Sequence, residues 1–558
     1  MDQVLLNRAN AALSLGQFES AIAAYDQYLA SNPASGEAWH NRGIALAQTK
    51  RFGPATQSFD KALSLFPQSA ASWHNRGLAF AELDQFEQAI RDHSRALALQ
   101  PRLPNVRGDL VLAKLNACEW QNLASERRRI SQALMNEEPA IVPFGNLLIS
   151  DSGEEQLRCA RIWMASHVGP TPPLWCGQHY QHDRIRVAYV SGDFRAHPVG
   201  ALIVSLLESH DRGKFECFGI SFGPDDGSEM RSRIAAALEH FVNVRGESDL
   251  EIAHVIREYQ IDIAVDLMGI TADCRPGIFA ARPAPVQAAY LGYPATMGAE
   301  FIDYTVADCI VVPEGKEQVF SEKIARLPNC YLPAACAPEP PKAWTRAEAG
   351  LPEDGFVFCC FNTNFKILPE TFESWMKILR AAGDSILWLS QPNPAAQLNL
   401  KREIARAGIA EDRLIFAPRV EPFEDHLRRV AAADLFLDTL PFNAHSTAIV
   451  ALSAGVPVLT CGGVTMVARA GASVLSAIGL PEMIAGTMQD YECRAIELAR
   501  DRGAFAAIRD KLLRNRSCMP LFDQKSFARN FEYALMEMHT QRMSGLPPRS
   551  FAVSGQHI

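Results

Sequence analysis

The stretch DLFLDTLPFNAHSTAIVALSAGVPVLT, residues 434–460, decides the fold of the C-terminal half of the chain. Its first apolar run stops at Asp438, and a loop with a proline follows. A second apolar run closes at Gly455 and leads into the apolar segment VPVLT. This order predicts a strand, a polar loop, a helix and a second strand, which together form a βαβ unit.

The helix predicted in this stretch opens with His445, Ser446 and Thr447. The first peptide N–H groups of a helix have no partner within the helix, so they attract an anion together with nearby hydroxyl and imidazole groups. The sequence therefore predicts a phosphate or diphosphate site here. The alternative is that Ser446 and Thr447 only cap the helix and that His445 is a polar loop residue.

Length, charge and cysteine usage exclude several classes of protein. A chain of 558 residues is long enough for two to four domains, and its composition is that of a soluble globular protein. The formal charge of -9, without a basic tract, argues against binding to nucleic acid or anionic membranes. The start of the sequence lacks the features of a signal peptide, so we expect a cytoplasmic protein. The thirteen cysteines form no C-x-x-C pair, and we expect neither a metal site nor disulfides.

The N-terminal part repeats itself with a period of 34 residues. WHNRGIALAQTKRFGPATQSFDKALSLFPQ starts at Trp39, and the similar WHNRGLAFAELDQFEQAIRDHSRALALQPR starts at Trp73. An earlier copy starts at Leu5. Aromatic, small and proline markers recur in register at Phe18, Phe52 and Phe86, at Ala21, Ala55 and Ala89, and at Pro33, Pro67 and Pro101. The pattern resembles tetratricopeptide repeats, which stack helix pairs into a solenoid with a concave face that binds protein segments.

We assign the repeats to residues 1–104. Four further segments follow them. Residues 105–181 are expected to form a helical cap and a linker, because they leave the 34-residue period and end in the breaker-rich GPTPPLWCGQHYQ. Strand-like and helix-like runs then alternate twice, which predicts an N-terminal lobe over residues 182–353 and a C-terminal lobe with closing helices over residues 354–541. Residues 542–558 are expected to be a tail. The fold class is thus α/β with an all-α N-terminal part.

Loops after the predicted strands should carry the chemistry, because ligands of parallel sheets bind outside the carboxyl ends of the strands. The motifs in these loops are YVSGDFRAHPVG (189–200), PDDGS (224–228), ARPAPVQAAYLGYPATMG (281–298), FSEKIARLPN (320–329), CCFNTNFKILPE (359–370) and LDTLPFNAHSTA (437–448). Their order behind the repeats resembles the nucleocytoplasmic protein O-GlcNAc transferases, a group that includes the Spindly-type O-fucosyltransferases. The resemblance covers most of the chain.

The resemblance implies a GT-B glycosyltransferase with two Rossmann-like lobes. Such an enzyme would move a sugar from a nucleotide to Ser or Thr of a protein acceptor, with inversion and without a metal or another cofactor. UDP-GlcNAc is the default donor that the resemblance implies. The large domain that animal members insert between the lobes is absent, and residues 332–353 take its place.

The resemblance also assigns residues to the donor side of the site. Lys366 matches the lysine that supports negative charge on the departing phosphate, and we expect it to face solvent. His426 and Arg429 match residues near the nucleobase and phosphates, although a surface ion pair is the alternative for Arg429. The full set of donor-binding candidates is Thr363, Lys366, His426, Arg429, His445, Ser446 and Thr447.

On the acceptor side, His197 in RAHPVG is a catalytic candidate together with Lys366. A histidine titrates near neutral pH, so it could take the proton of an attacking hydroxyl group. The alternative is that it orients the acceptor backbone or the donor sugar. Asp193 could orient His197 or cap the next helix, and Thr465 is a further candidate for a supporting role.

Several positions depart from the family pattern. Val450 stands where a carboxylate usually holds the ribose, and Val464 stands within the sequence that is Gly-Glu-Thr in many members. Ala295 replaces a glycine, and Asp262 replaces an animal histidine, as in the Spindly type. We interpret these changes as clustering on the nucleotide side of the site. They leave the identity of the nucleotide sugar open.

Three hypotheses follow. The first is a protein O-glycosyltransferase that uses UDP-GlcNAc, GDP-fucose or another nucleotide hexose. The second is a repeat-based interaction scaffold with weak catalysis, which Val450 and Val464 favour and which Lys366, His197 and His445 oppose. The third is an enzyme of the same fold that acts on a small molecule, which would not need the repeats. Binding of a nucleotide, and the effect of removing the repeats on transfer to protein, would discriminate among them.

Overall fold

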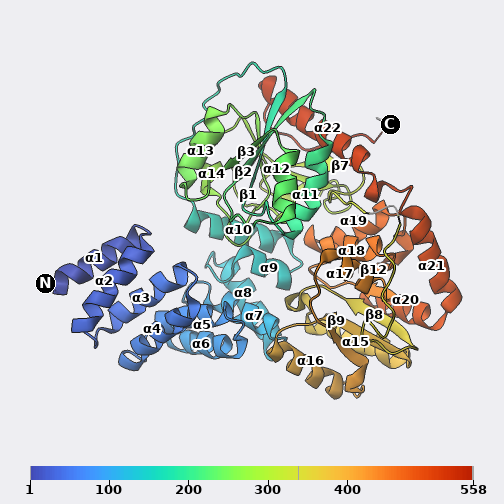
Figure 1. Cartoon of the computed structure of the whole chain (residues 1–558), viewed down its shortest axis with the longest axis horizontal. Helices are drawn as coiled ribbons and strands as arrows, with labels where there is room; N and C mark the ends of the chain where they lie inside the picture. The colour runs from blue at the N-terminus through green and yellow to red at the C-terminus, as the bar shows by residue number, and fades with distance from the viewer. Residues whose placement is uncertain (1, 337–338, 556–558) are drawn as a thin grey trace. The chain divides into compact units, whose positions relative to one another are not determined.

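The computed structural model describes residues 2–336 and 339–555, which form two compact units (Figure 1). The first unit comprises residues up to Gly145 together with Pro392–Glu403, and the second comprises Asn146–Gln391 together with the chain from Ile404 onward. Residue 1 of the predicted repeats, residues 337–338 of the predicted N-terminal lobe and residues 556–558 of the predicted tail lie outside the described residues.

The first unit begins with three helix pairs, and their register confirms the predicted period. The helices are α1 (Asp2–Ser14), α2 (Phe18–Ser31), α3 (Gly36–Gln48), α4 (Phe52–Leu65), α5 (Ala70–Ala81) and α6 (Phe86–Leu99). The marker phenylalanines are the first residues of the second helix in each pair. The marker alanines are all fully buried, because the helices cross at these positions.

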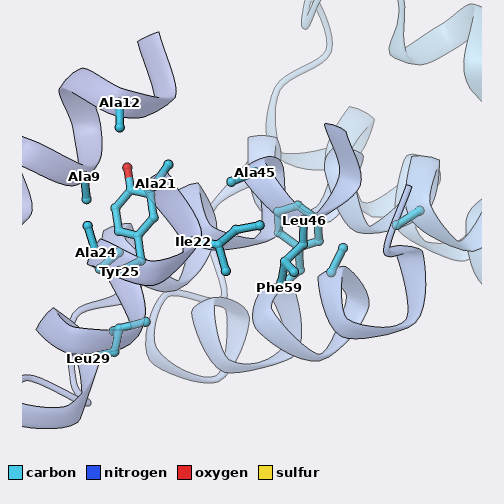
Figure 2. Close-up of a cluster of buried hydrophobic side chains, with 13 residues drawn as sticks. Ala9, Ala12, Ala21, Ile22, Ala24, Tyr25, Leu29, Ala45, Leu46 and Phe59 are labelled. Atoms are coloured by element: carbon cyan, nitrogen blue, oxygen red, sulfur yellow. The ribbon is translucent and has the colours of Figure 1, made fainter. Parts of the chain in front are cut away.

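A large ring packs against a small residue within the repeats. Tyr25, Phe59 and His93 occupy the same repeat position, and all three are buried. A Cβ atom added to Gly43 would lie 2.6 Å from the ring of Phe59, and one added to Gly77 would lie 2.6 Å from His93. Figure 2 shows Tyr25 and Phe59 within the resulting apolar core. The repeat therefore maintains a pairing of large with small side chains between neighbouring helices.

The predicted cap is helical and includes α7 (Val106–Asn116), α8 (Leu123–Met135), α9 (Pro143–Ile149) and α10 (Gly153–His167). The start of α16 (Pro394–Arg406) also belongs to the first unit. The side-chain amides of Asn393 and Asn399 donate to the carbonyl oxygens of Asn116 and Ala117 at 2.7 and 2.9 Å. The sequence predicts this helix to belong to the C-terminal lobe alone, and these contacts are not predicted from it.

The second unit contains two parallel sheets, as the alternating pattern predicted. The first has the order β14-β7-β6-β5-β4-β1-β2-β3. Its strands are β1 (Ile185–Ser191), β2 (Phe215–Ser221), β3 (His240–Asn243), β4 (Ile263–Asp266), β5 (Val286–Ala289), β6 (Tyr304–Asp308), β7 (Lys323–Leu327) and β14 (Phe551–Ala552). Its helices are α11 (Pro198–Ser209), α12 (Glu229–Ala237), α13 (Asp249–Glu258) and α14 (Gly277–Ala280).

The second sheet has the order β10-β9-β8-β11-β12-β13. Its strands are β8 (Phe356–Cys360), β9 (Ser385–Ser390), β10 (Leu414–Ala417), β11 (Leu435–Leu437), β12 (Val458–Cys461) and β13 (Ile484–Ala485). The accompanying helices are α15 (Pro369–Ala381), α17 (Phe423–Val430), α18 (Ser446–Ser453), α19 (Ala470–Ala477), α20 (Met488–Arg500) and α21 (Arg502–Asn515). Residues 434–460 thus form β11, a loop, α18 and β12, which confirms the predicted βαβ unit.

The end of the chain returns to the first sheet. Helix α22 (Gln524–Met543), red in Figure 1, packs on this lobe, where Glu532 accepts a hydrogen bond from the backbone N–H of Asp211 at 2.7 Å. Strand β14 then pairs in parallel with β7. The sequence predicts only a tail after residue 541, so strand β14 is not predicted from it. In the described part of the chain, no helix combines the length and apolar character needed to cross a bilayer.

Candidate active site

Asn362 connects the loops that follow β8 and β11 in the second sheet. Its side-chain N–H donates to Thr439 Oγ1 at 2.8 Å, and its side-chain oxygen accepts a hydrogen bond from Thr447 Oγ1. Asn362 is buried, so these bonds replace the water that its amide group would otherwise contact. One side chain therefore positions the start of α18 relative to the ends of two strands.

Asp438, at the end of β11, holds the loop before α18 in place. Its carboxylate accepts hydrogen bonds from the N–H groups of Thr439 and Ala444 at 2.8 and 2.6 Å, and from Thr460 Oγ1 at 2.7 Å. Burial raises the pKa of this carboxyl group to about 6, although the hydrogen bonds oppose the shift. From the sequence, Asp438 is predicted only to end a strand. A carboxylate directly after a buried apolar run was the available signal.

Two of the predicted donor residues converge on one carbonyl group. Lys366 Nζ donates to the carbonyl oxygen of Asn443 at 3.3 Å, and His445 Nδ1 lies 3.0 Å from the same oxygen. The Lys366 ammonium also lies 4.0 Å from the centre of the Phe442 ring. Asn443 was named in no prediction of a site residue, because its contribution is a backbone atom.

Lys366 is partly buried, so the expectation of a solvent-facing lysine is wrong. It lies in the 3₁₀ turn Asn364–Lys366, which directs its side chain toward the loop before α18. Burial lowers its pKa to about 8, and the Asp438 carboxylate and Cys360 thiol oppose this shift. A cation held in partly desolvated surroundings interacts more strongly with a ligand anion than an exposed lysine does.

His445 is a neutral imidazole across the ordinary working range of pH. Burial lowers its pKa to about 3, and the Lys366 charge lowers it further, against the effect of the Asn443 carbonyl. A neutral ring that faces a carbonyl through Nδ1 carries its proton on that nitrogen. Its Nε2 is buried and has no hydrogen-bond partner in the described chain. The site therefore contains a polar atom that a ligand can satisfy.

His426 and Arg429 form a second group beside Phe361, at the end of β8. His426 Nδ1 lies 2.8 Å from Arg429 Nη2, and both side chains lie against the Phe361 ring, at centre distances of 5.8 and 5.3 Å. Burial lowers the pKa of His426 to about 4. Arg429 is 4% exposed, and no carboxylate pairs with it within the described residues. The alternative of a surface ion pair for Arg429 is therefore wrong.

The other donor-side candidates have fewer contacts. Thr363 is exposed, and its carbonyl oxygen accepts a hydrogen bond from the N–H of Lys366 at 3.0 Å. Ser446 is the first residue of α18 and is partly exposed. Val450 lies one turn further along the same helix, also partly exposed. It presents no hydrogen-bonding side chain there.

His197 lies in the first lobe, at the start of α11. Its Nδ1 accepts a hydrogen bond from the N–H of Val199 at 3.3 Å and lies 3.4 Å from the Asp193 carboxylate. Two roles were predicted for Asp193. The role of helix cap is filled by His197 itself, and the Asp193 carboxylate faces the imidazole instead. Burial lowers the pKa of His197, although Asp193 opposes this shift.

The loop that carries His197 is fixed by an aspartate to which the sequence alone assigns no role. Asp226, in the PDDGS motif, accepts a hydrogen bond from the N–H of Ala196 at 2.9 Å. Gly200 allows the loop to approach the helix, because an added Cβ atom would lie 2.5 Å from the carbonyl oxygen of Arg195. These contacts explain why the motif needs a glycine and an acidic partner.

The interpretation of Asp262 as a change on the nucleotide side is wrong. Asp262 precedes β4, and its carboxylate accepts a hydrogen bond from the N–H of Arg186 at 2.9 Å and lies 3.2 Å from His182 Nδ1. The candidate residues follow the carboxyl ends of strands, whereas Asp262 is at the amino end of its strand. Asp262 therefore contacts the backbone and a histidine of the first lobe and none of the donor-side candidates.

The structure connects two of the donor-side candidates, whereas His426 and Arg429 form a separate group and His197 lies in the other lobe. Thr447 and Lys366 are joined through Asn362, Asn443 and the loop before α18. No hydrogen bond or ion pair between described residues links His197 to that group. Thr465 lies in another loop, where its hydroxyl group donates to Asp151 at 2.8 Å.

The fold and the site define a class of protein. Tetratricopeptide helices precede two parallel-sheet lobes of the GT-B type, and a partly buried cation lies at the carboxyl edge of the second sheet. The profile of glycosyl transferase family 41 matches residues 174–336 and 333–531, and a tetratricopeptide repeat profile matches residues 6–70. The chain belongs to glycosyl transferase family 41.

Individual relatives agree with this assignment. A protein of Arabidopsis thaliana named "Probable UDP-N-acetylglucosamine–peptide N-acetylglucosaminyltransferase SEC" is 36% identical over 66% of this chain and 38% of its own length. The UDP-N-acetylglucosamine–peptide N-acetylglucosaminyltransferase of Caenorhabditis elegans is 26% identical over 77% of this chain and 48% of its own length. The chain therefore spans less than half the length of these curated relatives.

A solved structure is similar along nearly the whole chain. A methionine-for-lysine mutant of the Thermobaculum terrenum O-GlcNAc transferase superposes with a TM-score of 0.73 at 29% identity. The match covers 98% of this chain and 98% of that one. The resemblance to the O-GlcNAc transferases found in the motifs is thus confirmed for family and fold.

Proposed function

We propose that the protein transfers a sugar from a nucleotide diphosphate donor to Ser or Thr side chains of protein acceptors. The observation that carries the proposal is the convergence of Lys366 and His445 on the Asn443 carbonyl, at the start of α18. A helix start, an ammonium group and an unpartnered imidazole nitrogen together suit a diphosphate. UDP-GlcNAc is the donor we propose, in line with the names of the relatives.

The proposed reaction is a single displacement with inversion. The acceptor hydroxyl oxygen attacks the anomeric carbon, and the bond between that carbon and the β-phosphate oxygen breaks. Negative charge develops on the departing diphosphate, where Lys366 and the first N–H groups of α18 stabilise it. These fixed positive groups supply the charge that a divalent metal would otherwise supply, so we propose that transfer needs no metal.

The proton of the attacking hydroxyl group needs an acceptor, and we propose His197. Burial lowers its pKa, so the imidazole is neutral and able to accept a proton at neutral pH. The Asp193 carboxylate, 3.4 Å from Nδ1, favours the tautomer in which Nδ1 carries the proton and Nε2 is free. The N–H of Val199, which lies 3.3 Å from Nδ1, favours the opposite tautomer, in which Nε2 carries the proton, as long as no acceptor protein is bound. In the alternative role, His197 only orients the acceptor or the sugar.

We propose that the repeats bind the acceptor protein on their concave face. Such a surface is larger than a small acceptor requires, which argues against a small-molecule substrate. The donor itself has one open alternative, GDP-fucose, because Val450 provides no acceptor for ribose hydroxyl groups. We assign the nucleobase side to His426 and Arg429, where the Phe361 ring adds an aromatic wall.

A scaffold with weak catalysis is the second candidate, favoured by Val450 and by Val464, whose side chain is 68% exposed. The two candidates differ in what they bind. We therefore propose to measure thermal shifts of the purified chain with UDP-GlcNAc, UDP-glucose, GDP-fucose, UDP and GDP. A ligand that binds only the folded state raises the melting temperature.

The enzyme proposal expects a shift with one nucleotide family that is lost in His445→Ala. A matched control is His167→Ala, which removes a histidine from the exposed end of α10 and should leave the shift intact. Absence of a shift with every nucleotide at millimolar concentration would refute the enzyme and favour the scaffold.

A further inference from the structure

Asp151 binds a loop of the second sheet although it comes from the helical segment before the first lobe. Its Oδ2 accepts a hydrogen bond from the N–H of Val464 at 2.8 Å. Its Oδ1 accepts two, from the N–H of Thr465 at 2.9 Å and from Thr465 Oγ1 at 2.8 Å. Three donors thus converge on one carboxylate across more than 300 positions of sequence.

This arrangement is not the capping of the helix that follows Asp151. Ser152 caps α10, because its side chain accepts a hydrogen bond from the N–H of Glu155. All three hydrogen bonds of the Asp151 carboxylate instead come from residues 463–468, which we call the 463–468 loop. Gly463 permits the approach, because a Cβ atom added there would lie 2.7 Å from Asp151 Oδ2.

The 463–468 loop is closed on itself by two backbone hydrogen bonds. The N–H of Gly463 donates to the carbonyl oxygen of Ala468 at 2.8 Å. The N–H of Ala468 donates to the carbonyl oxygen of Thr465 at 3.1 Å. A carboxylate that fixes Val464 and Thr465 consequently fixes the whole loop.

The loop in turn contacts the residue that orients the two donor-side groups. The N–H of Asn443 donates to the carbonyl oxygen of Val467 at 3.3 Å, and the side-chain oxygen of Asn443 accepts from the N–H of Gly471 at 3.3 Å. The carbonyl oxygen of Asn443 is the atom that Lys366 and His445 share. Hydrogen bonds, joined by the short backbone stretch from Thr465 to Val467, therefore connect Asp151 to both groups.

We propose that Asp151 is a positioning residue for the diphosphate site: it anchors the 463–468 loop, which holds Asn443 and thereby Lys366 and His445 in their binding geometry. The inference rests on the proposed function of that site. Val464 and Thr465 then act through their backbone N–H groups, which bind Asp151. The identity of the side chain at position 464 is immaterial for this role. The valine at this position is then compatible with full activity.

The test compares Asp151→Asn with the matched control Ser152→Ala in the full-length chain. In Asp151→Asn, an amide N–H₂ replaces one oxygen and meets an N–H donor, so at least one anchoring bond is lost. We expect the Kd for UDP or GDP, whichever binds the wild type, to rise about tenfold or more. Ser152→Ala removes the cap of α10 and should leave that Kd unchanged.

Two further measurements separate positioning from general stability. Hydrogen exchange of the N–H groups of Asn443, Val464 and Thr465 should accelerate in Asp151→Asn and not in Ser152→Ala. Thr465→Ser keeps the hydroxyl group and should retain the wild-type Kd, whereas Thr465→Val should weaken binding in the same direction as Asp151→Asn.

The outcomes are distinct. A wild-type chain that binds nucleotide, together with an Asp151→Asn chain that binds it equally well, overturns the inference and leaves the proposed function in place. A wild-type chain that binds no nucleotide overturns both. If Asp151→Asn does not fold, an unchanged Kd in Thr465→Val overturns the inference.

Discussion

At the scale of single residues, the main feature is the close approach of a lysine and a histidine to one carbonyl oxygen. Both groups are cationic when protonated, so their proximity disfavours the double positive charge. Burial and the Lys366 charge keep His445 neutral, while Lys366 retains its proton below pH 8. The unliganded site therefore contains one cation and one neutral ring, and an entering diphosphate supplies the charge that would stabilise a second cation.

Lys366→Met tests the role of the ammonium group. Methionine keeps the length of the side chain against Phe442 but removes the charge, so we expect turnover to fall about 100-fold or more. Burial lowers the pKa of Lys366 to about 8 and thereby disfavours its ammonium form in the folded state. The resulting loss of folding stability is fully present below pH 8 and disappears as the pH rises beyond the ordinary lysine range. The melting temperature at pH 7 should therefore rise.

The measurements are steady-state turnover and thermal unfolding at pH 7. Lys401→Met, at an exposed position of α16, serves as the control and should change neither. Turnover of Lys366→Met within a few-fold of wild type would contradict the role assigned to the lysine.

Proton uptake on nucleotide binding tests the state of His445. Its Nδ1 faces the Asn443 carbonyl, so Nε2 can donate to a phosphate oxygen only after it gains a proton. At pH 6.5 Lys366 is already protonated, since its pKa is about 8, and His445 is neutral, since its pKa is about 3. Binding of UDP or GDP at this pH should therefore take up a proton at His445.

Calorimetric titrations in buffers with different ionisation enthalpies report this uptake. The dependence of the binding enthalpy on the buffer should be present in the wild type and reduced in His445→Gln. A wild-type enthalpy that is the same in all buffers would show that Nε2 accepts a hydrogen bond from the ligand instead.

At the scale of elements, α11 and its preceding loop show how a glycine positions a side chain. His197 precedes Pro198 and caps the helix with its own imidazole, and the loop folds back over Gly200. The packing leaves no space for a methyl group between the helix and the Arg195 carbonyl. The conformation of His197 is therefore coupled to the absence of a side chain one turn later.

Gly200→Ala should disturb this element. An added Cβ atom would lie 2.5 Å from a backbone oxygen, so the loop must shift, at a cost of about 1–3 kcal/mol in the free energy of unfolding. We expect urea-induced unfolding at lower concentration and a loss of turnover beyond the loss of folded protein. Gly383→Ala is the control, because no atom lies within 4 Å of its added Cβ. Equal stability of both variants would contradict the close approach.

The sequence predicted the elements around the site better than the contacts between them. The βαβ unit of residues 434–460 followed from the positions of apolar runs, and local patterns of this kind record secondary structure directly. The role of Asn443 did not follow, because it depends on a backbone carbonyl. The partner of Thr465 did not follow either, since Asp151 is distant in sequence and belongs to a helical segment.

At the scale of the whole molecule, the repeats were the most predictable part. A fixed period constrains every unit in the same way, so the residues Tyr25, Phe59 and His93 could be aligned before any contact was known. The contribution of α16 to the first unit was not predictable in this way. Its contacts through Asn393 and Asn399 are made once in the chain and leave no periodic trace.

A shortened chain tests the proposed division of labour. Removal of residues 2–68 deletes the first two helix pairs and keeps α5 and α6 against α7. We expect the Kd for nucleotide to stay the same, because the donor-side residues all lie in the second unit. Transfer to a protein acceptor should fall several-fold, measured by incorporation of labelled sugar. A short peptide acceptor is the control, and equal losses for peptide and protein would refute a role of these repeats in acceptor binding.

The pairing of β14 with β7 has a consequence for biosynthesis. The N–H of Ile324 in β7 bonds to the Ser550 side chain, 226 positions later in the chain. At typical translation rates, the edge of the first sheet stays unpaired on the ribosome for roughly tens of seconds after β7 has emerged. During that interval it is an open template for pairing with other chains. Slow synthesis of the second lobe should therefore increase aggregation of the nascent chain and its dependence on chaperones.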